Sequence, residues 1–161
     1  MLQFHCKKKK QIVRTASERQ EEKMEKPQIL LLTHGGWGMD LLRGVRMILG
    51  EVDCVTEIPL TPELTLADYI GKVTEFARTM PEHSVILTDM FGGTTSNAGA
   101  KVGRELNIPV YSGLNAPMLL DACSQIMFDG DLNPQEVLES GQGAAKDVVA
   151  EILESLKNKN A

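Results

Sequence analysis

Cysteine is scarce in this chain of 161 residues, and its three copies follow no metal-binding or redox spacing. Cys6, Cys54 and Cys123 are odd in number and lie far apart, which gives neither a disulfide framework nor a zinc site. No apolar run approaches the roughly 18 residues that a membrane span requires. The basic run Lys7–Lys10 is followed by polar residues and not by the apolar stretch of a secretory signal. We therefore expect a cytoplasmic protein with no direct membrane insertion.

Positive charge is also in short supply beyond the first residues. Residues 24–161 carry ten Lys and Arg against nineteen Asp and Glu, a net charge of −9, whereas residues 1–23 carry a net charge of +4. Because an acidic surface repels phosphate backbones, we expect no nucleic acid among the partners of the folded part. Hydrophobic residues make up 42% and charged residues 24%, which is typical of a globular domain and excludes a disordered chain or a coiled coil.

The basic segment 1–23 is predicted to be a disordered extension, and residues 24–161 a single domain. Met24 is followed at once by Glu25-Lys26-Pro27 and a strand-like run, as natural amino termini often are. Purine-rich codons for Glu21-Glu22-Lys23 would resemble a bacterial ribosome-binding site. The hypothesis is that translation starts at Met24 and that the extension is not native. A nucleic-acid or membrane arm is the alternative, which the shortness of the segment and its lack of an apolar face disfavour.

Short apolar runs alternate with helical periodicity from residue 28 onward. Strands are predicted at residues 28–33, 53–58, 84–88 and 109–113. Helices are predicted at residues 37–49, 65–80, 94–106 and 116–127, with a last helical segment from residue 133. Strands separated by helices predict an α/β fold, a doubly wound and mostly parallel sheet of order 2-1-3-4 with helices on both faces.

Two local patterns refine this prediction. Thr65 and Asp68 have the spacing of a capping box at the start of a helix. Gly141 and Gly143 interrupt the last helical segment, and the pattern does not distinguish a helix break from a short extra strand.

His34 and Asp89 follow the first and third predicted strands, which flank the switch point in a sheet of this order. Imidazole acts as a base, a metal ligand or a nucleophile, and no partners at metal-ligand spacing are visible. A nucleophilic histidine needs an acceptor for its second ring nitrogen, and Asp89 is suitably placed. The alternative for Asp89 is a helix cap or turn residue. His5 lies in the extension, and His83 precedes the third strand at the opposite end of the sheet.

The segment 91–97 is a glycine turn that leads into a helix amino terminus rich in hydroxyl groups. Free backbone N–H groups and the helix dipole favour an anion there. We predict that Gly35, Gly92, Gly93, Thr94 and Thr95 bind phosphate; ordinary N-capping is the alternative for the threonines. A histidine, a carboxylate and a phosphate cradle together predict a phosphohistidine carrier. No GxSxG elbow, P-loop or complete dinucleotide fingerprint competes with it.

Three segments carry a resemblance to a known family: LLTHGGWG at 31–38, ILTDMFGGTTSNAGA at 86–100 and SGLNAPMLL at 112–120. The chain resembles the IIA domain of mannose-family (mannose/fructose/sorbose) sugar phosphotransferase systems. The resemblance implies that His34 is phosphorylated, that Asp89 orients it and that the Thr94 hydroxyl contacts the phosphoryl group. Thr95 stands where a proline is common in the family.

The resemblance further implies a flavodoxin-like fold, a homodimer with exchanged carboxy-terminal elements, and no cofactor or metal. The histidine phosphocarrier protein would be the phosphoryl donor and a IIB component the acceptor, in support of sugar uptake. A phospho-sensing regulatory module and a dihydroxyacetone-kinase-type phosphotransfer subunit are the alternatives, and a small hydrolase with a His34–Asp89 base pair is a third. The sugar itself is not legible in this sequence.

Partner docking is expected to combine charge and apolar contact. Arg43 and Arg46 are the basic residues near the predicted site, on an otherwise acidic body. Trp37 and Phe91 flank the site in sequence and would supply an apolar contact if they are exposed; packing into the core is the alternative.

Overall fold

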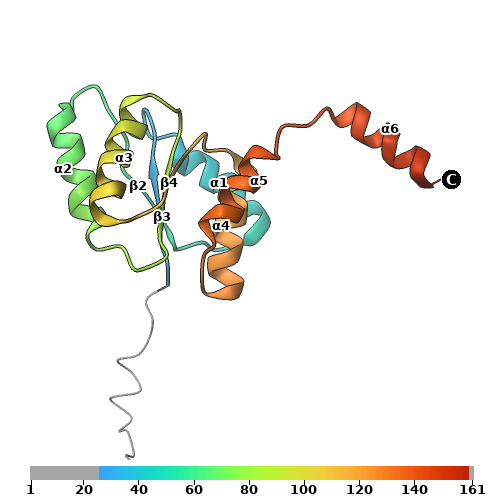
Figure 1. The fold of residues 1–161 in the computed structure, drawn as a ribbon, viewed down its shortest axis with the longest axis horizontal. Helices are drawn as coiled ribbons and strands as arrows, with labels where there is room; N and C mark the ends of the chain where they lie inside the picture. Colours follow the sequence, from blue (N-terminus) through green and yellow to red (C-terminus); the bar gives the residue numbers. More distant parts are fainter. Residues whose placement is uncertain (1–25, 160–161) are drawn as a thin grey trace, which may run out of the picture.

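A computed structural model describes residues 26–159 of the chain (Figure 1). Its sheet has four parallel strands in the order β2-β1-β3-β4. The strands are β1 (Ile29–Leu32), β2 (Val55–Glu57), β3 (Val85–Thr88) and β4 (Val110–Ser112). The predicted doubly wound α/β fold is confirmed. The predicted extension at residues 1–23 lies outside the described residues.

The helices lie where the apolar periodicity places them, with one irregular turn. They are α1 (Gly38–Leu49), α2 (Leu66–Ala77), α3 (Thr94–Leu106), α4 (Ala116–Ser124), α5 (Pro134–Gln142) and α6 (Val148–Lys159). A π-helical turn at Gln125–Asp129 continues α4. Thr65 is the N-cap of α2, because its hydroxyl accepts the Asp68 N–H at 3.2 Å, and the same hydroxyl donates to the Asp68 carboxylate at 2.6 Å. Asp68 thus bonds to the Thr65 hydroxyl and not to the backbone N–H that a full capping box would use.

Both faces of the sheet are covered, which explains why β1 is apolar throughout. Figure 1 shows α2 and α3 on one side of the sheet and α1, α4 and α5 on the other. Ile29 and Leu31 belong to the core on the α1 and α4 side, and Leu30 and Leu32 to the core on the α2 and α3 side. All four side chains are fully buried. A strand buried on both faces needs a continuous apolar run.

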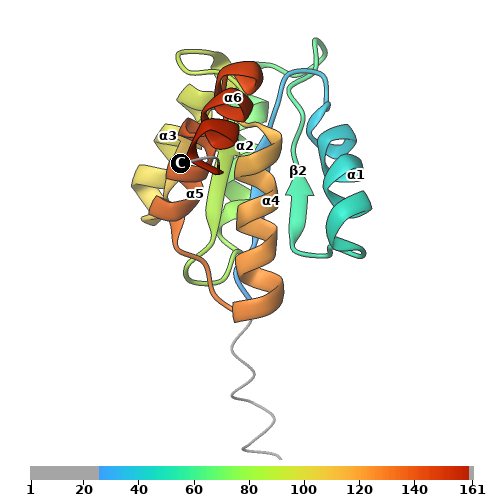
Figure 2. The same ribbon diagram turned by 90° about the vertical axis from the view of Figure 1, so that its right-hand side faces the viewer.

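The carboxy-terminal segment contains a helix break and not an extra strand among the described residues. Helix α5 ends at Gln142, and a short connection leads to α6, which projects away from the body of the molecule (Figures 1 and 2). The large apolar side chains of α6 are all more than half exposed: Val148, Val149, Ile152, Leu153 and Leu156. The spacing of these side chains places them on one face of α6, which is therefore amphipathic. Within residues 26–159 no other helix or strand covers this apolar face.

Candidate active site

His34 and Asp89 meet at the carboxyl edge of the two central strands. Leu32 pairs with Thr88 in the parallel register of β1 and β3, so the residues that follow each strand are neighbours. The Nδ1 atom of His34 lies 2.8 Å from Oδ2 of Asp89, and the backbone N–H of His34 donates to the same oxygen at 2.8 Å. Asp89 is buried, whereas the His34 side chain is 40% exposed. Within residues 26–159 the Nε2 atom has no hydrogen-bond partner.

The Asp89 carboxylate accepts four hydrogen bonds, two on each oxygen. Oδ2 takes the two bonds from His34, and Oδ1 accepts the Met90 N–H at 2.8 Å and the Thr95 hydroxyl at 2.7 Å. Burial raises the pKa of Asp89, but the hydrogen bonds from His34 and Thr95 lower it by more, so that the pKa lies below its ordinary value. An ionised carboxylate can only accept, so Nδ1 of His34 is the donor in this bond, and in the neutral ring the lone pair is on Nε2.

The glycine turn brings the amino terminus of α3 against the imidazole. Gly93 is the N-cap of α3, and a Cβ atom built on it would lie 3.3 Å from Cε1 of His34. No side chain caps the helix, and the backbone N–H groups of Gly92, Gly93, Thr94 and Thr95 have no acceptor among the described residues. Side-chain capping, the alternative for the threonines, is therefore not what the structure shows. The helix presents unsatisfied donors beside His34, an arrangement that favours an anion.

Two of the five predicted phosphate-binding residues, Gly35 and Thr95, have a donor group that is already hydrogen-bonded to another part of the protein. The backbone N–H of Gly35 donates to the Leu60 carbonyl at 2.9 Å. The Thr95 side chain is fully buried, and its hydroxyl donates to Asp89. The positive φ of Gly35 (70°) is required by the turn itself. In both cases the sequence indicated a residue close to the site but could not indicate which acceptor its donor would find.

Residues 28–134 match the model of a protein family, EIIA-man, described as "PTS system fructose IIA component". The chain belongs to this family of phosphotransferase-system IIA components. A related protein, the sorbose-specific EIIA component of the phosphotransferase system of Lacticaseibacillus casei, is 34% identical over 98 residues, which cover 58% of this chain and 70% of the relative. Membership makes the chain a mannose-family IIA component that takes part in sugar phosphotransfer.

Solved structures of phosphotransferase-system IIA proteins have a similar fold. An EIIA component from Streptococcus agalactiae superposes with a TM-score of 0.68 at 23% identity, over 76% of this chain and 98% of that one. The mannose/sorbose-specific IIA subunit from Enterococcus faecalis gives a TM-score of 0.67 at 24% identity, over 77% and 96%. At these identities the likeness concerns the fold. No helix within residues 26–159 of the IIA chain has the length and apolar character to span a membrane.

An open cleft of about 680 Å³ adjoins His34 in this IIA component. Its lining consists of His34, Gly35, Leu60, Thr61, Pro62, Leu64, Leu66 and Thr94. Trp37 and Phe91, which flank the site in sequence, are 39% and 93% exposed. Core packing, the alternative interpretation of these two aromatic residues, is therefore wrong. The histidine is bordered by apolar side chains that a partner protein could cover.

A contact that the sequence analysis missed fixes the loop after His34. Glu57, at the end of β2, accepts the N–H groups of Gly38 at 2.8 Å and Met39 at 3.1 Å, and the Thr33 hydroxyl donates to it. Helix α1 has no side-chain cap of its own, so Glu57 performs that function from a neighbouring strand. Position 38 requires a small residue, because a Cβ atom there would lie only 2.6 Å from Oε1 of Glu57. Glycine meets this requirement. The sequence did contain a signal for this contact, namely an acidic residue at the carboxyl end of β2, the strand beside β1.

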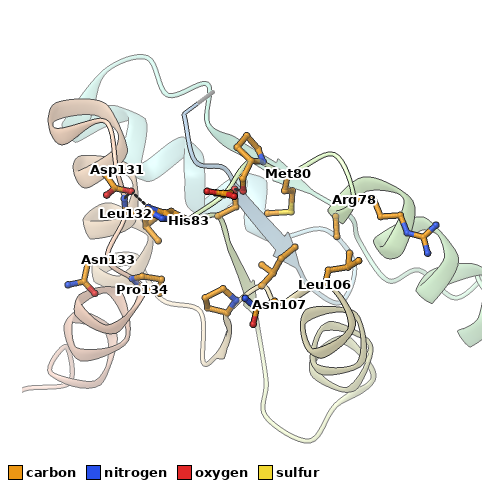
Figure 3. A pocket seen from close by; sticks show the side chains of 15 residues that line it. Arg78, Met80, His83, Leu106, Asn107, Asp131, Leu132, Asn133 and Pro134 are labelled. Atoms are coloured by element: carbon orange, nitrogen blue, oxygen red, sulfur yellow. Dashed lines mark hydrogen bonds and ion pairs between the residues drawn. The ribbon is translucent and has the colours of Figure 1, made fainter. Parts of the chain in front are cut away.

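His83 lies at the opposite edge of the sheet, as predicted, but it is not isolated. Its Nδ1 atom lies 2.6 Å from Oδ1 of Asp131, and both residues line a cleft of about 920 Å³ together with Arg78 and Asn107 (Figure 3). The hydrogen bond to Asp131 and the charge of that carboxylate raise the pKa of His83. Both side chains are more than half exposed, unlike the His34–Asp89 pair. Within residues 26–159 no cluster of ligating side chains could hold a metal ion.

Proposed function

We propose that this IIA component is a phosphohistidine carrier, in which Nε2 of His34 accepts a phosphoryl group from the histidine phosphocarrier protein and passes it to a IIB component. The observation that carries the proposal is the bond between Nδ1 of His34 and Asp89, which leaves the lone pair on Nε2 beside the free amino terminus of α3. An attacking nitrogen with an oriented lone pair is the requirement for phosphoryl transfer between histidines.

The transfer forms one bond and breaks one. The Nε2 lone pair attacks the phosphorus of the donor phosphohistidine, and the donor's P–N bond breaks with its electron pair returning to the donor ring. The Nδ1 proton stays on His34, so the phosphorylated ring carries positive charge, which the adjacent Asp89 carboxylate stabilises. Transfer to IIB is the same step in reverse, with the IIB nucleophile attacking the phosphorus.

The phosphoryl oxygens would lie against the first turn of α3. Gly92, Gly93, Thr94 and Thr95 would contribute backbone N–H groups, and Thr94 lines the same cleft as His34, which favours a contact from its hydroxyl. Gly35 contributes close approach of the main chain and not a donor, because its N–H group is bonded to Leu60. We assign the Thr95 contact to its backbone for the same reason, since its hydroxyl is bonded to Asp89.

Both partners are proposed to dock over the exposed side chains of Trp37, Met90 and Phe91 around His34. The expectation that Arg46 lies near the site is wrong: it is in the last turn of α1 and donates to the carbonyl of Val52, which precedes β2, at 2.8 Å, whereas His34 follows β1 at the opposite edge of the sheet. Arg43 forms an ion pair with Asp40 at 2.7 Å. The rim therefore presents apolar surface on a body of net negative charge, which fits a partner with basic groups around its own histidine.

A homodimer is proposed, with α6 as its main contact. The apolar face of α6 is exposed and has no partner within the described part of one chain, and a second copy offers the same face. We expect Ile152→Glu with Leu156→Glu to yield monomers in analytical ultracentrifugation, whereas Glu154→Lys on the polar face of α6 should leave the dimer intact. Dimers of the double variant would exclude α6 as the contact.

Phosphorylation in a purified system tests the proposed function. Phosphoenolpyruvate, enzyme I and the phosphocarrier should add the mass of one phosphoryl group to the intact chain, in an acid-labile and base-stable form that maps to His34. His34→Ala should take up none, and His83→Ala, which removes the other described histidine with a carboxylate partner, should be labelled normally. Addition of a mannose-family IIB domain should then discharge the label; a label that persists would favour the phospho-sensing alternative.

A further inference from the structure

The hydroxyl of Thr95 has no part in the proposed phosphoryl binding, which uses only the backbone N–H of this residue. Thr95 is the second residue of α3, its side chain is fully buried, and its hydroxyl donates to Oδ1 of Asp89 at 2.7 Å. We propose that Thr95 is a positioning residue for phosphoryl transfer, which acts through Asp89 to hold His34 in its reactive orientation. This inference rests on the proposed function of His34 and assigns Thr95 a role other than a hydroxyl contact to phosphate.

The two oxygens of Asp89 differ in what holds them. Oδ2 is bonded to His34 twice, and it therefore sets the orientation of the ring. Oδ1 is bonded to Met90, which follows Asp89 in the chain, and to Thr95. The terminal torsion of an aspartate is broad, so the carboxylate turns easily unless both oxygens are held. Met90 moves with Asp89, whereas Thr95 belongs to a helix, so Thr95 is the contact that ties the carboxylate to another element.

The hydrogen bond between Thr95 and Asp89 also connects the two parts of the site, His34 with its carboxylate and the first turn of α3. The first turn of α3 contributes the N–H groups proposed to bind the phosphoryl oxygens, and the same turn contributes the Thr95 hydroxyl. The distance between the attacking nitrogen and those donors is therefore set through Asp89 and Thr95 together. A hydrogen bond to an ionised group is stronger than one between neutral groups, particularly where water is excluded, as it is here with Asp89 7% exposed.

The hydroxyl also helps to keep Asp89 ionised. Hydrogen bonds to the carboxylate from His34 and from Thr95 lower the pKa of Asp89 against the effect of burial. Near neutral pH the carboxylate is ionised, but without the Thr95 hydroxyl its Oδ1 is held by Met90 alone. The carboxylate can then turn, Nδ1 loses its fixed acceptor, and the ring proton can occupy Nε2, where it blocks the lone pair. Loss of the Thr95 hydroxyl should therefore increase the population of rings in the unreactive tautomer.

Three variants separate this role from a purely structural one. Thr95→Val keeps the shape of the side chain and removes the donor, and Thr95→Ser keeps the donor. Thr95→Ala also removes the donor but does not add the extra methyl group of valine. A folding defect caused by valine alone can therefore be recognised. Ser96→Ala is the matched control, because it removes a hydroxyl from the same turn that donates to the Gly93 carbonyl at 3.0 Å and not to Asp89.

The decisive measurement is nitrogen NMR of the His34 ring in the unphosphorylated protein across a pH series. We expect the Nδ1–H tautomer in the wild type, Thr95→Ser and Ser96→Ala, and a mixture of tautomers in Thr95→Val and Thr95→Ala. Rates of phosphoryl transfer should fall about tenfold in the same two variants and recover in Thr95→Ser. Wild-type tautomers and rates in both donor-free variants would overturn the proposal.

The ring measurement requires no phosphoryl donor, so it distinguishes two kinds of failure. A wild-type protein that takes up no phosphoryl group would contradict the function proposed for His34, whatever the tautomers show. Normal phosphorylation of the wild type together with unaltered ring tautomers in Thr95→Val and Thr95→Ala would contradict the role of Thr95 alone.

Discussion

Oδ2 of Asp89 accepts two hydrogen bonds from the same residue, one from the backbone N–H of His34 and one from its ring Nδ1, each at 2.8 Å. The first bond fixes the position of the His34 main chain, and the second fixes the rotation and tautomer of its ring. A single carboxylate oxygen thus determines both where the imidazole lies and which of its nitrogens can react.

Replacement of Asp89 by asparagine should slow phosphoryl transfer by up to about 10⁴-fold while the fold is retained. The amide removes the charge that stabilises a phosphorylated ring, and its NH₂ group can direct the ring proton to Nε2. Rapid-mixing transfer rates from the phosphocarrier would measure the effect, with circular dichroism to check the fold. An unchanged rate would leave Asp89 with a structural role alone, through its hydrogen bonds with Met90 and Thr95.

The stability of the protein should decrease in acid partly through Asp89. The pKa of Asp89 is lowered in the folded state, since the hydrogen bonds from His34 and Thr95 outweigh burial. Its contribution to the free energy of unfolding is therefore fully present above the unfolded pKa of about 3.9 and is lost as the pH falls through the lower folded value. Urea unfolding of wild type and Asp89→Asn should differ by a constant amount near neutral pH and converge in acid. A gap that does not change with pH would contradict this assignment.

Glu57→Ala should destabilise the protein by about 1–2 kcal/mol, because it removes the cap of α1 and leaves Gly38 and Met39 without their acceptor. Urea unfolding would measure the loss. Glu51→Ala, an exposed residue after α1, is the control and should change stability little. Equal stabilities of the two variants would mean that water replaces the carboxylate as the cap.

Phe91→Ala should weaken transfer from the phosphocarrier without affecting stability, since this side chain is 93% exposed. We expect the half-saturating concentration of the phosphocarrier to rise and the maximal rate to stay near that of the wild type. Phe128→Ala removes another exposed phenylalanine, on the π-helical turn that leads to Asp131, the hydrogen-bond partner of His83, at the opposite edge of the sheet, and should have no effect. Similar kinetics for Phe91→Ala and the wild type would place the docking surface elsewhere.

Transfer from the phosphocarrier should also slow markedly between low salt and roughly 0.5 M salt, as screening shortens to a few ångström. The reason is the net charge of −9 on residues 24–161, which would attract a basic rim on the donor. Stopped-flow rates across a salt series, repeated with Phe91→Ala, separate the two contributions. A flat salt dependence would indicate apolar docking alone.

The sequence predicted the strands, the layers and the proximity of His34 to Asp89 because these follow from local periodicity and one topological rule. Apolar runs such as 28–33 specify buried strands, and strand order then brings two particular strand ends together. The partners of Gly35, Thr95 and Glu57 could not be predicted in the same way. Each bonds to a residue on another element or around a turn, at a distance that depends on packing and not on sequence spacing.

Exposure of Trp37 and Phe91 was equally beyond the sequence, because an aromatic residue next to a glycine turn packs inward in some proteins and outward in others. Helix α6 illustrates the same limit. Its amphipathic pattern predicts a buried face, but only the structure shows that its own chain does not cover it within residues 26–159.

Phosphorus–nitrogen NMR of the phosphorylated protein, with ¹⁵N in the histidine rings, tests the central claim most directly. After phosphorylation by the phosphocarrier, the phosphorus should couple to Nε2 of His34, while Nδ1 keeps its proton in a hydrogen bond to Asp89. Coupling to Nδ1, or a phosphoryl group on any other residue, would contradict the account.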